Sequence, residues 1–249
     1  MSVHHELPRT DRTRHPVRHM LKYFRWLGRF VIGLRYRVEV LHGERVPKSG
    51  PVLYASNHVG VFDGPLLAIY SPRPSHTLTK EEMFTGVMKF VLRWVGQISQ
   101  DRFQADPAAV KTALRALREG SAVGIFPEGA RGAGDLQRFH RGAAYLAMVS
   151  GATVVPVTQI GTREPGGHSN SLPRKGAHIQ LVYGEPMKVP PHPWPRTPEQ
   201  VTEVSRQLRA HMLVQLADAL KETGRELPGP LPAGEQEPDP GGNVTEDSA

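Results

Sequence analysis

Apolar and polar residues follow two different periods along this chain, and each period predicts one kind of element. Apolar residues that recur every three or four positions predict helices, and short apolar runs bounded by Gly and Pro predict buried strands. Predicted helices cover residues 16–34, 63–70, 83–95, 106–120, 142–149 and 198–222. Asp106 is expected to cap the fourth of them with Pro107 at its first position, and Pro65 suits the first position of the second. Predicted strands cover residues 36–41, 52–55, 76–79, 96–102 (with a loop), 122–126, 153–158 and 177–183. Because strands alternate with helices, we expect an α/β fold, a single domain with a mixed, mostly parallel sheet flanked by helices.

The segment 16–34 is the clearest amphipathic helix. Apolar residues form one face, and a basic stripe lies about 200° around the axis from it. The stripe consists of Arg18, Lys22, Arg25 and Arg29. With Trp26 and Phe30 added, this composition fits a helix that lies in a membrane interface. It equally fits a helix packed on the domain with a solvated basic face, and both can hold for one helix.

The composition divides the chain into four regions. We expect disorder at residues 1–15, an N-terminal amphipathic basic segment at 16–48, the main domain at 49–224 and a disordered tail at 225–249. The tail is rich in Pro and Gly and has six acidic residues against one basic residue, without apolar periodicity. Within the domain, Pro156 interrupts a strand, so we expect a bulge or the end of a hydrogen-bonded ladder there.

Charge and cysteine content narrow the partners and the setting. The net charge of +7 comes from residues 1–50, which hold eleven Lys or Arg against four Asp or Glu. This basic end predicts an anionic partner, and aromatic residues on a continuous apolar helix face favour an anionic membrane surface over nucleic acid. No run of 18 apolar residues or secretory segment occurs, and there is no cysteine. We therefore expect a cytoplasmic protein that associates peripherally with the inner face of the cell membrane.

The strongest candidate for chemistry is the segment from Ser56 to Gly64, between two apolar runs. His58 and Asp63 are five residues apart, which on a straight helix separates their side chains by about 140°. A turn between a buried strand and a helix would bring them together, and we expect Gly60 and Gly64 to provide its backbone freedom. An imidazole oriented by a carboxylate is a general base. The alternative is an Asp63 that merely caps the helix.

Four short motifs occur in order over about residues 50–160. They are Asn57-His58-x4-Asp63, Gly96 to Arg102, Phe126-Pro127-Glu128-Gly129-Ala130-Arg131 and Val154-Val155-Pro156-Val157. Together they resemble the glycerolipid acyltransferase family, whose best-known members are the 1-acylglycerol-3-phosphate acyltransferases. Two positions depart from the family pattern. Ala130 stands where relatives usually have Thr or Ser, and the Gln100-Asp101-Arg102 end of the second motif is variable.

The resemblance implies a reaction and a set of site residues. His58 would be the general base and Asp63 its orienting partner, in transfer of an acyl group from acyl-CoA or acyl carrier protein to 1-acylglycerol-3-phosphate, giving phosphatidic acid. No cofactor or metal would be needed beyond this co-substrate. The resemblance places six residues at the substrate: Asn57, Lys80, Arg102, Glu128, Gly129 and Arg131. Arginine pairs well with a phosphate monoester, because its forked donors match the phosphate oxygens.

Three other functions are compatible with parts of this pattern. An acyltransferase of the same family could use another lysophospholipid or a glycolipid as acceptor. A non-catalytic peripheral lipid-binding protein could keep the fold without the reaction. A metallohydrolase is disfavoured, because no second His lies at ligand spacing from His58.

Overall fold

A computed structural model of the chain describes residues 6–235 and residue 244. The helices are α1 (His19–Gly33), α2 (Asp63–Tyr70), α3 (Gly86–Trp94), α4 (Pro107–Arg118), α5 (Gly142–Ser150) and α6 (Pro198–Thr223), with 3-10 turns η2 (Gly43–Arg45) and η3 (Glu81–Met83). The strands are β1 (Arg37–Leu41), β2 (Val52–Ser56), β3 (Ser75–Lys80), β4 (Ile98–Gln100), β5 (Ala122–Ile125), β6 (Thr153–Ile160), β7 (His178–Tyr183) and β8 (Met187–Lys188). Each helix and strand predicted from the sequence is present, with ends that differ by a few residues. The short strand β8 was not predicted, because it lies within a proline-rich crossing.

One mixed sheet forms the centre of the molecule, with strand order β1-β7-β6-β2-β5-β3-β4 and β8 paired to β6. Strands β6, β2, β5, β3 and β4 are mutually parallel, whereas β7 and β8 run antiparallel to β6. The predicted α/β fold with a mostly parallel sheet is therefore confirmed. Since the parallel strands point the same way, the loops that follow them meet at one edge of the sheet.

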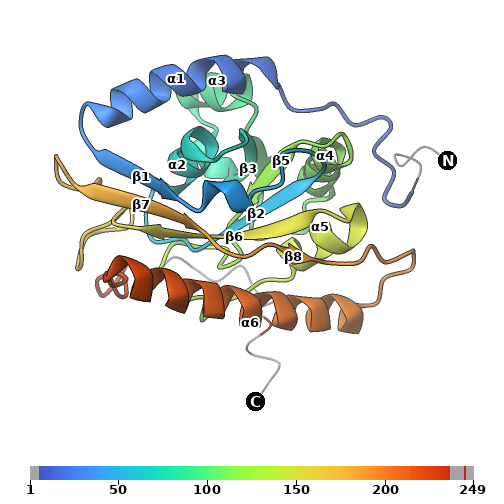
Figure 1. The fold of residues 1–249 in the computed structure, drawn as a ribbon. Coiled ribbons are helices and arrows are strands. Elements are labelled where there is room, and N and C mark those ends of the chain that lie inside the picture. The colour runs from blue at the N-terminus through green and yellow to red at the C-terminus, as the bar shows by residue number, and fades with distance from the viewer. Residues whose placement is uncertain (1–5, 236–243, 245–249) are drawn as a thin grey trace.

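Helices cover both faces of the sheet (Figure 1). On one face, α4, α5 and α6 pack on apolar residues of β2, β5 and β6 in the largest core cluster. On the other face, α2 packs on the alternate residues of the same strands, and α1 lies outside α2. All five residues of β2 are buried, because a central parallel strand is covered on both sides.

Helix starts follow local chemistry, with one difference from prediction. The Asp106 side chain accepts a hydrogen bond from the Ala109 N–H at 2.9 Å, and Pro107 occupies the first turn of α4, as predicted. Helix α2 begins at Asp63 without a side-chain cap, so Pro65 is its third residue rather than its first. Asp63 is not a helix cap.

Strand β6 runs through Pro156 without the predicted bulge on its β2 side, whereas the predicted ladder end occurs on its other side. Pro156 pairs with Ala55 of β2, and the ladder continues to the next residue. On the other side, β8 pairs with residues 153–154 and β7 with residues 157–160, so Pro156 faces the junction between these partners. Its carbonyl accepts the Gly184 N–H at 2.9 Å. The missing proline N–H therefore removes no rung of the ladder.

Parts of both terminal regions pack on the domain although they contain no helix or strand. Before α1, Thr10 is buried, and Arg118 donates to the carbonyls of Glu6 and Pro8. After α6, Arg225 donates to the His178 carbonyl at 2.6 Å. The described parts of both ends, residues 6–15 and 225–235, thus contact the domain through hydrogen bonds between arginines and carbonyls, which composition does not reveal. Residues 1–5, 236–243 and 245–249 lie outside the described part of the chain.

The basic stripe of helix α1 is not simply exposed to solvent, because Arg25 and Arg29 contact the backbone at the end of α2. Arg25 donates to the Ile69 carbonyl at 2.8 Å and to the Ser71 carbonyl, and Arg29 donates to the Ile69 carbonyl at 3.1 Å. These bonds satisfy carbonyls at the end of α2. Burial lowers the pKa of Arg25 to about 10. Two residues of the predicted basic stripe therefore hold α1 onto α2. On the same helix Leu21 and Ile32 are buried, whereas Trp26 and Phe30 are exposed.

Candidate active site

The candidate site lies at the edge of the sheet where the parallel strands end. His58 follows β2, Lys80 ends β3, Arg102 follows β4 and Arg131 follows β5. These side chains lie on different loops but line one cavity. The parallel topology brings them together, as expected for ligand sites in such sheets.

His58 and Asp63 form the pair that the sequence predicted. His58 Nδ1 lies 2.8 Å from Asp63 Oδ2, and the same oxygen accepts the backbone N–H groups of Val59 at 2.7 Å and Gly60 at 2.9 Å. Asp63 is fully buried, whereas the His58 side chain is 19% exposed and lines the cavity. Three N–H groups that converge on one oxygen fix the carboxylate, which in turn fixes the imidazole tautomer. Nε2 is then the ring nitrogen available to accept a proton from a ligand.

The turn between His58 and Asp63 does not depend on left-handed glycines, contrary to the prediction. Gly60 and Gly64 are absent from the positive-φ glycines of the described chain. At Gly60, however, an added Cβ would lie 3.1 Å from the Thr162 carbonyl oxygen and 3.5 Å from Arg163 Cβ. Gly60 is therefore required because another loop packs closely against it. At Gly64 an added Cβ would meet nothing within 4 Å.

The loop after β5 holds the backbone of His58 from both sides. Glu128 Oε1 accepts the His58 N–H at 2.8 Å, and the His58 carbonyl accepts the Gly132 N–H at 2.9 Å. The Phe126 ring stacks on the imidazole with centroids 4.1 Å apart and an interplanar angle of 19°. Burial raises the pKa of Glu128 to about 8, despite the opposing effect of the His58 N–H. The position of His58 thus depends on residues about 70 positions away.

Asn57 and Glu128, expected at the substrate, point into the protein instead. Asn57 Nδ2 donates to the Gln159 carbonyl at 3.1 Å, and Asn57 Oδ1 accepts the Gln159 N–H at 2.8 Å. The Asn57 amide thus makes the two hydrogen bonds that a neighbouring strand's backbone would make, and it extends the pairing of β2 with β6. Asn57 is 2% and Glu128 3% exposed, and neither lines the cavity. The structure gives both residues contacts that position the His58 loop.

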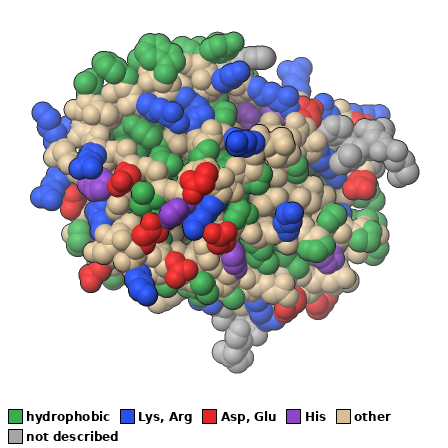
Figure 2. All heavy atoms as spheres, viewed as in Figure 1, with side chains coloured by type: hydrophobic (Ala, Val, Ile, Leu, Met, Phe, Trp, Pro, Cys, Tyr) green, Lys and Arg blue, Asp and Glu red, His purple; other side chains and the backbone are tan. Residues whose placement is uncertain are grey.

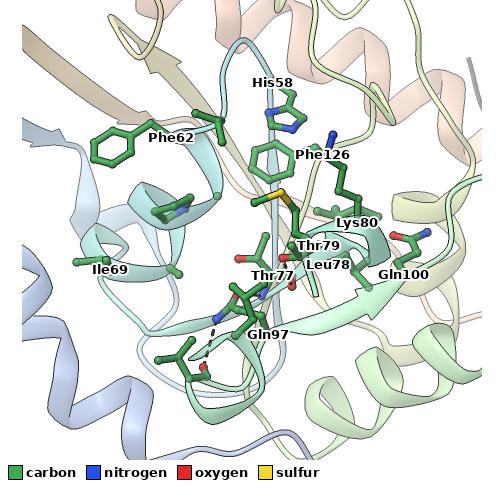
Figure 3. A pocket seen from close by; sticks show the side chains of 18 of the residues that line it. His58, Phe62, Ile69, Thr77, Leu78, Thr79, Lys80, Gln97, Gln100 and Phe126 are labelled. Carbon is green, nitrogen blue, oxygen red and sulfur yellow. Dashed lines mark hydrogen bonds between the residues drawn. The ribbon is translucent and has the colours of Figure 1, made fainter. Parts of the chain in front are cut away.

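The cavity has a volume of about 780 Å³ and a polar and an apolar end. His58, Phe126, Lys80 and Gln100 line one end of the cavity and lie on the same side of the view in Figure 3. Arg102, Gly129 and Arg131 also line it. Four of the six residues predicted at the substrate, Lys80, Arg102, Gly129 and Arg131, therefore share one cavity with His58.

Both arginines of the cavity are held by neighbouring backbone. Arg102 donates to the Gly129 carbonyl at 2.9 Å, and its side chain is 14% exposed. Arg131 donates to the Ser169 carbonyl at 3.1 Å and to Asn170 Oδ1 at 2.7 Å. These contacts orient two cations toward the same space, which suits an anionic group of a ligand.

The apolar end of the cavity runs between α1, α2 and α3. Its lining there is formed by aliphatic and aromatic side chains, among them Leu21, Phe24, Ile69, Met88 and Val91. Figure 3 shows Ile69 on one wall and Thr77 and Gln97 at a distance from His58. An apolar space that opens beside a His–Asp pair can hold a hydrocarbon chain next to a proton acceptor.

Sequence reasoning missed three residues of the site: Phe126, Gln159 and Arg163. Phe126 belongs to a recognised motif, but its stacking on His58 depends on the tertiary fold. Gln159 and Arg163 are 0% and 2% exposed polar residues at and just after the end of β6. A charged residue after an apolar parallel strand was the available signal. Among the described residues, no group of three His, Asp or Glu has the arrangement of a metal site.

Comparisons with known proteins agree with this geometry. A family model described as Acyltransferase matches residues 37–159. The 1-acyl-sn-glycerol-3-phosphate acyltransferase of Bacillus subtilis (strain 168) is 30% identical over 165 residues, which cover 63% of this chain and 77% of that protein. The protein of the same name from Pseudomonas aeruginosa is 28% identical over 217 residues, covering 85% of this chain and 80% of its own.

A solved structure shares the fold. The crystal structure of the 1-acyl-sn-glycerophosphate (LPA) acyltransferase PlsC from Thermotoga maritima superposes with a TM-score of 0.64 at 22% identity. The likeness covers 82% of this chain and 80% of that one. This likeness shows the fold. The family model and the relative from Bacillus subtilis show that this chain belongs to the glycerolipid acyltransferase family and is an acyltransferase.

Proposed function

We propose that this enzyme transfers a fatty acyl group from an acyl thioester, acyl-CoA or acyl carrier protein, to the free hydroxyl of 1-acylglycerol-3-phosphate, giving phosphatidic acid. The observation that carries the proposal is the 2.8 Å contact between His58 Nδ1 and buried Asp63 beside a cavity with a cationic and an apolar end. The relatives are named for this reaction. No further cofactor enters the scheme.

The geometry supports direct transfer with His58 as the general base. Nε2 takes the proton of the acceptor hydroxyl. The hydroxyl oxygen attacks the thioester carbonyl carbon and forms the new C–O bond. The C–S bond then breaks, and the imidazolium returns the proton to the departing sulfur. Asp63 stabilises the imidazolium in between. The chain has no cysteine, so no cysteinyl acyl-enzyme can form.

The cationic end of the cavity is suited to the acceptor phosphate. Lys80, Arg102 and Arg131 line it together with His58. A phosphate held there would present the glycerol hydroxyl toward Nε2, and this positioning lowers the barrier by fixing the reacting groups close together. Gly129 adopts a φ of +69° without strain, and its carbonyl accepts from Arg102, which positions this arginine at the cavity.

The apolar end of the cavity is suited to an acyl chain. It is lined by α1 and α3 as well as α2, so it opens toward the exposed faces of two helices. This placement supports a role for residues 16–34 and 83–95 in lining the entry of the fatty chain. A chain entering between the two helices would bring its thioester to His58.

We also propose that the surface of α1 and α3 docks on an anionic membrane. Trp26, Phe30 and Phe90 are 69%, 61% and 74% exposed, and Phe24 contacts Trp94 with ring centroids 4.4 Å apart, joining the two helices. Figure 2 shows hydrophobic side chains gathered over α1 at the top of the molecule. So many exposed aromatic residues indicate a binding surface, and a bilayer fits because the apolar cavity opens beside it. Among the described residues, no helix is long and apolar enough to cross the bilayer. This placement corresponds to peripheral association with the inner face of the cell membrane.

The direct test is an acyl-transfer assay with a panel of lysolipids, analysed by mass spectrometry. Acyl-CoA and acyl carrier protein are compared as donors, and lysophosphatidic acid, other lysophospholipids and a glycolipid as acceptors. Phosphatidic acid as the main product supports the proposal. A main product from another acceptor would show an acyltransferase of different specificity. Vesicle binding without any transfer would support a non-catalytic lipid-binding protein.

A further inference from the structure

Arg163 is a buried cation that holds four segments of the chain. It is 2% exposed, and its Nε donates to the Val59 carbonyl at 2.8 Å, Nη1 to the Gly167 carbonyl at 2.9 Å and Nη2 to the Gly132 carbonyl at 3.0 Å. Nη2 also donates to the Gly229 carbonyl. The acceptors Val59, Gly167, Gly132 and Gly229 lie after β2, β6, β5 and α6 respectively. Arg163 lies four residues beyond Gln159, the last residue that the family model matches.

A continuous chain of hydrogen bonds leads from Arg163 to His58. The Val59 carbonyl and the Gly60 N–H belong to the same peptide group. Its carbonyl accepts from Arg163 Nε, and its N–H donates to Asp63 Oδ2 at 2.9 Å. That oxygen lies 2.8 Å from His58 Nδ1. The guanidinium therefore sets the orientation of the peptide that anchors the carboxylate beside the imidazole.

The charge of Arg163 acts on the same pair. Burial lowers the pKa of its guanidinium, and the carboxylates of Asp63 and Glu235 oppose this shift. The buried guanidinium and the fully buried Asp63 carboxylate attract each other across the Val59–Gly60 peptide. Ionised Asp63 is the form that can stabilise a protonated His58.

The segment after α6 completes the arrangement. Besides the Gly229 contact with Arg163, Glu235 accepts from His168 and from the Ser169 N–H, the latter at 3.3 Å. The Ser169 carbonyl in turn accepts the Val61 N–H at 3.1 Å. The segment after α6 thus binds the 162–176 loop through Glu235. Through Ser169, this loop binds the loop that carries His58.

We propose that Arg163 is a positioning residue for the acyl-transfer reaction, acting through the Val59–Gly60 peptide and Asp63 on the orientation of His58. The inference rests on the proposed role of His58. Arg163 does not line the cavity, so it acts on turnover rather than on substrate binding. Its loss leaves the Val59 carbonyl, on the peptide whose N–H binds Asp63, without this buried donor.

The test compares R163Q and R163K with R73Q as the matched control in the full-length protein. Arg73 also donates to three backbone carbonyls, those of Pro47, Gly50 and Gly120. Gly50 and Gly120 precede β2 and β5, so Arg73 works at the opposite edge of the sheet from His58. Both substitutions remove a similar set of structural bonds, but only R163Q affects the catalytic pair.

Steady-state kinetics give the first readout. R163Q should lower kcat about tenfold or more while both KM values stay within about threefold, because a misoriented base loses part of its contribution to the rate. R163K should recover part of kcat, and R73Q should keep wild-type kcat at a comparable loss in Tm. R163Q with wild-type kcat, or with a loss no larger than that of R73Q, would overturn the inference. If R163Q does not fold, R163K is judged by the same comparison.

A second readout does not need turnover. The proton NMR signal of His58 Nδ1–H, identified by its absence in H58A, should shift or broaden in R163Q and R163K and remain unchanged in R73Q. An unchanged signal in the Arg163 variants would overturn the inference even if kcat falls. If wild-type protein transfers no acyl group but the signal still depends on Arg163, the proposed function fails and the positioning role stands.

Discussion

Glu128 Oε1 accepts the backbone N–H of His58 at 2.8 Å, although the two residues are 70 positions apart. Glu128 is fully enclosed, and burial raises its pKa from the ordinary 4.5 to about 8. The carboxyl group of a motif expected at the substrate therefore holds the backbone of the candidate base. This contact also couples the ionisation of Glu128 to the stability of the loop that carries His58.

We expect E128Q to change the pH dependence of stability. The folded protein keeps a proton on Glu128 that the unfolded chain loses between about pH 4.5 and pH 8, so the wild-type free energy of unfolding falls through this window. Glutamine keeps the oxygen acceptor and does not ionise. In urea unfolding, the free energy of unfolding of E128Q minus that of wild type should rise by at least about 1 kcal/mol between about pH 5 and pH 8.

Glu199 provides the control for that experiment. Its pKa is lowered by a hydrogen bond with its own backbone N–H and by another with Thr197. Stability due to Glu199 is therefore lost only as the pH falls through this lowered pKa, and E199Q should differ from wild type by a constant amount over the same window. If the free energy of unfolding of E128Q also differs from that of wild type by a constant amount over this window, the raised pKa of Glu128 is contradicted.

Replacing His58 with Ala should lower kcat by about 10²-fold or more, and D63N should cause a similar loss by disturbing the tautomer. Both substitutions remove groups whose contact is 2.8 Å long. H178A is the matched control, because His178 also contacts a carboxylate, that of Glu39 at 2.9 Å, on β7 and β1 away from the cavity. The acyl-transfer assay measures all three. Full activity in folded H58A would exclude His58 as the base.

Replacing Arg131 with Ala should raise the KM for the lysolipid acceptor about tenfold or more, because a charge-assisted bond to phosphate is lost. The KM for the acyl thioester should change little. N170A is the control, since Asn170 accepts from Arg131 at 2.7 Å and its loss disturbs the same loop without removing the cation. Equal rises of both KM values in R131A would count against phosphate binding at this residue.

Replacing Trp26, Phe30 and Phe90 together with Ser should reduce binding to vesicles of phosphatidylcholine and phosphatidylglycerol at least about a hundredfold. Each buried aromatic side chain contributes about 1.5–3 kcal/mol when it leaves water. All three are exposed in the folded chain, so the fold should persist. Vesicle co-sedimentation measures the change.

The control for the membrane experiment is W194S combined with V214S. Trp194 and Val214 are 60% and 56% exposed, and they lie on the proline-rich crossing and on α6, away from α1 and α3. If this control binds vesicles as well as wild type does, the loss in the first variant is due to removing side chains from α1 and α3 and not to lower surface hydrophobicity in general. An equal loss in both variants would mean that α1 and α3 are not the docking surface.

The sequence by itself predicted the elements and the contact between His58 and Asp63. The alternation of apolar runs located the strands, and Asp106 with Pro107 marked the start of α4. The five-residue spacing of His58 and Asp63 across a strand-to-helix turn predicted their contact, because that geometry is local. The motif positions after β4 and β5 also placed Arg102 and Arg131 correctly at the cavity.

Only the tertiary structure decided which polar groups face the cavity and which hold the loops. Asn57 and Glu128 point inward because their partners, Gln159 and the His58 backbone, lie about 70–102 residues away in sequence. The period of α1 predicted two faces, but not that Arg25 would face α2 while Trp26 faces outward. Periodicity describes a helix alone, whereas the choice between its faces depends on the unsatisfied carbonyls and apolar surfaces that the folded chain places beside it.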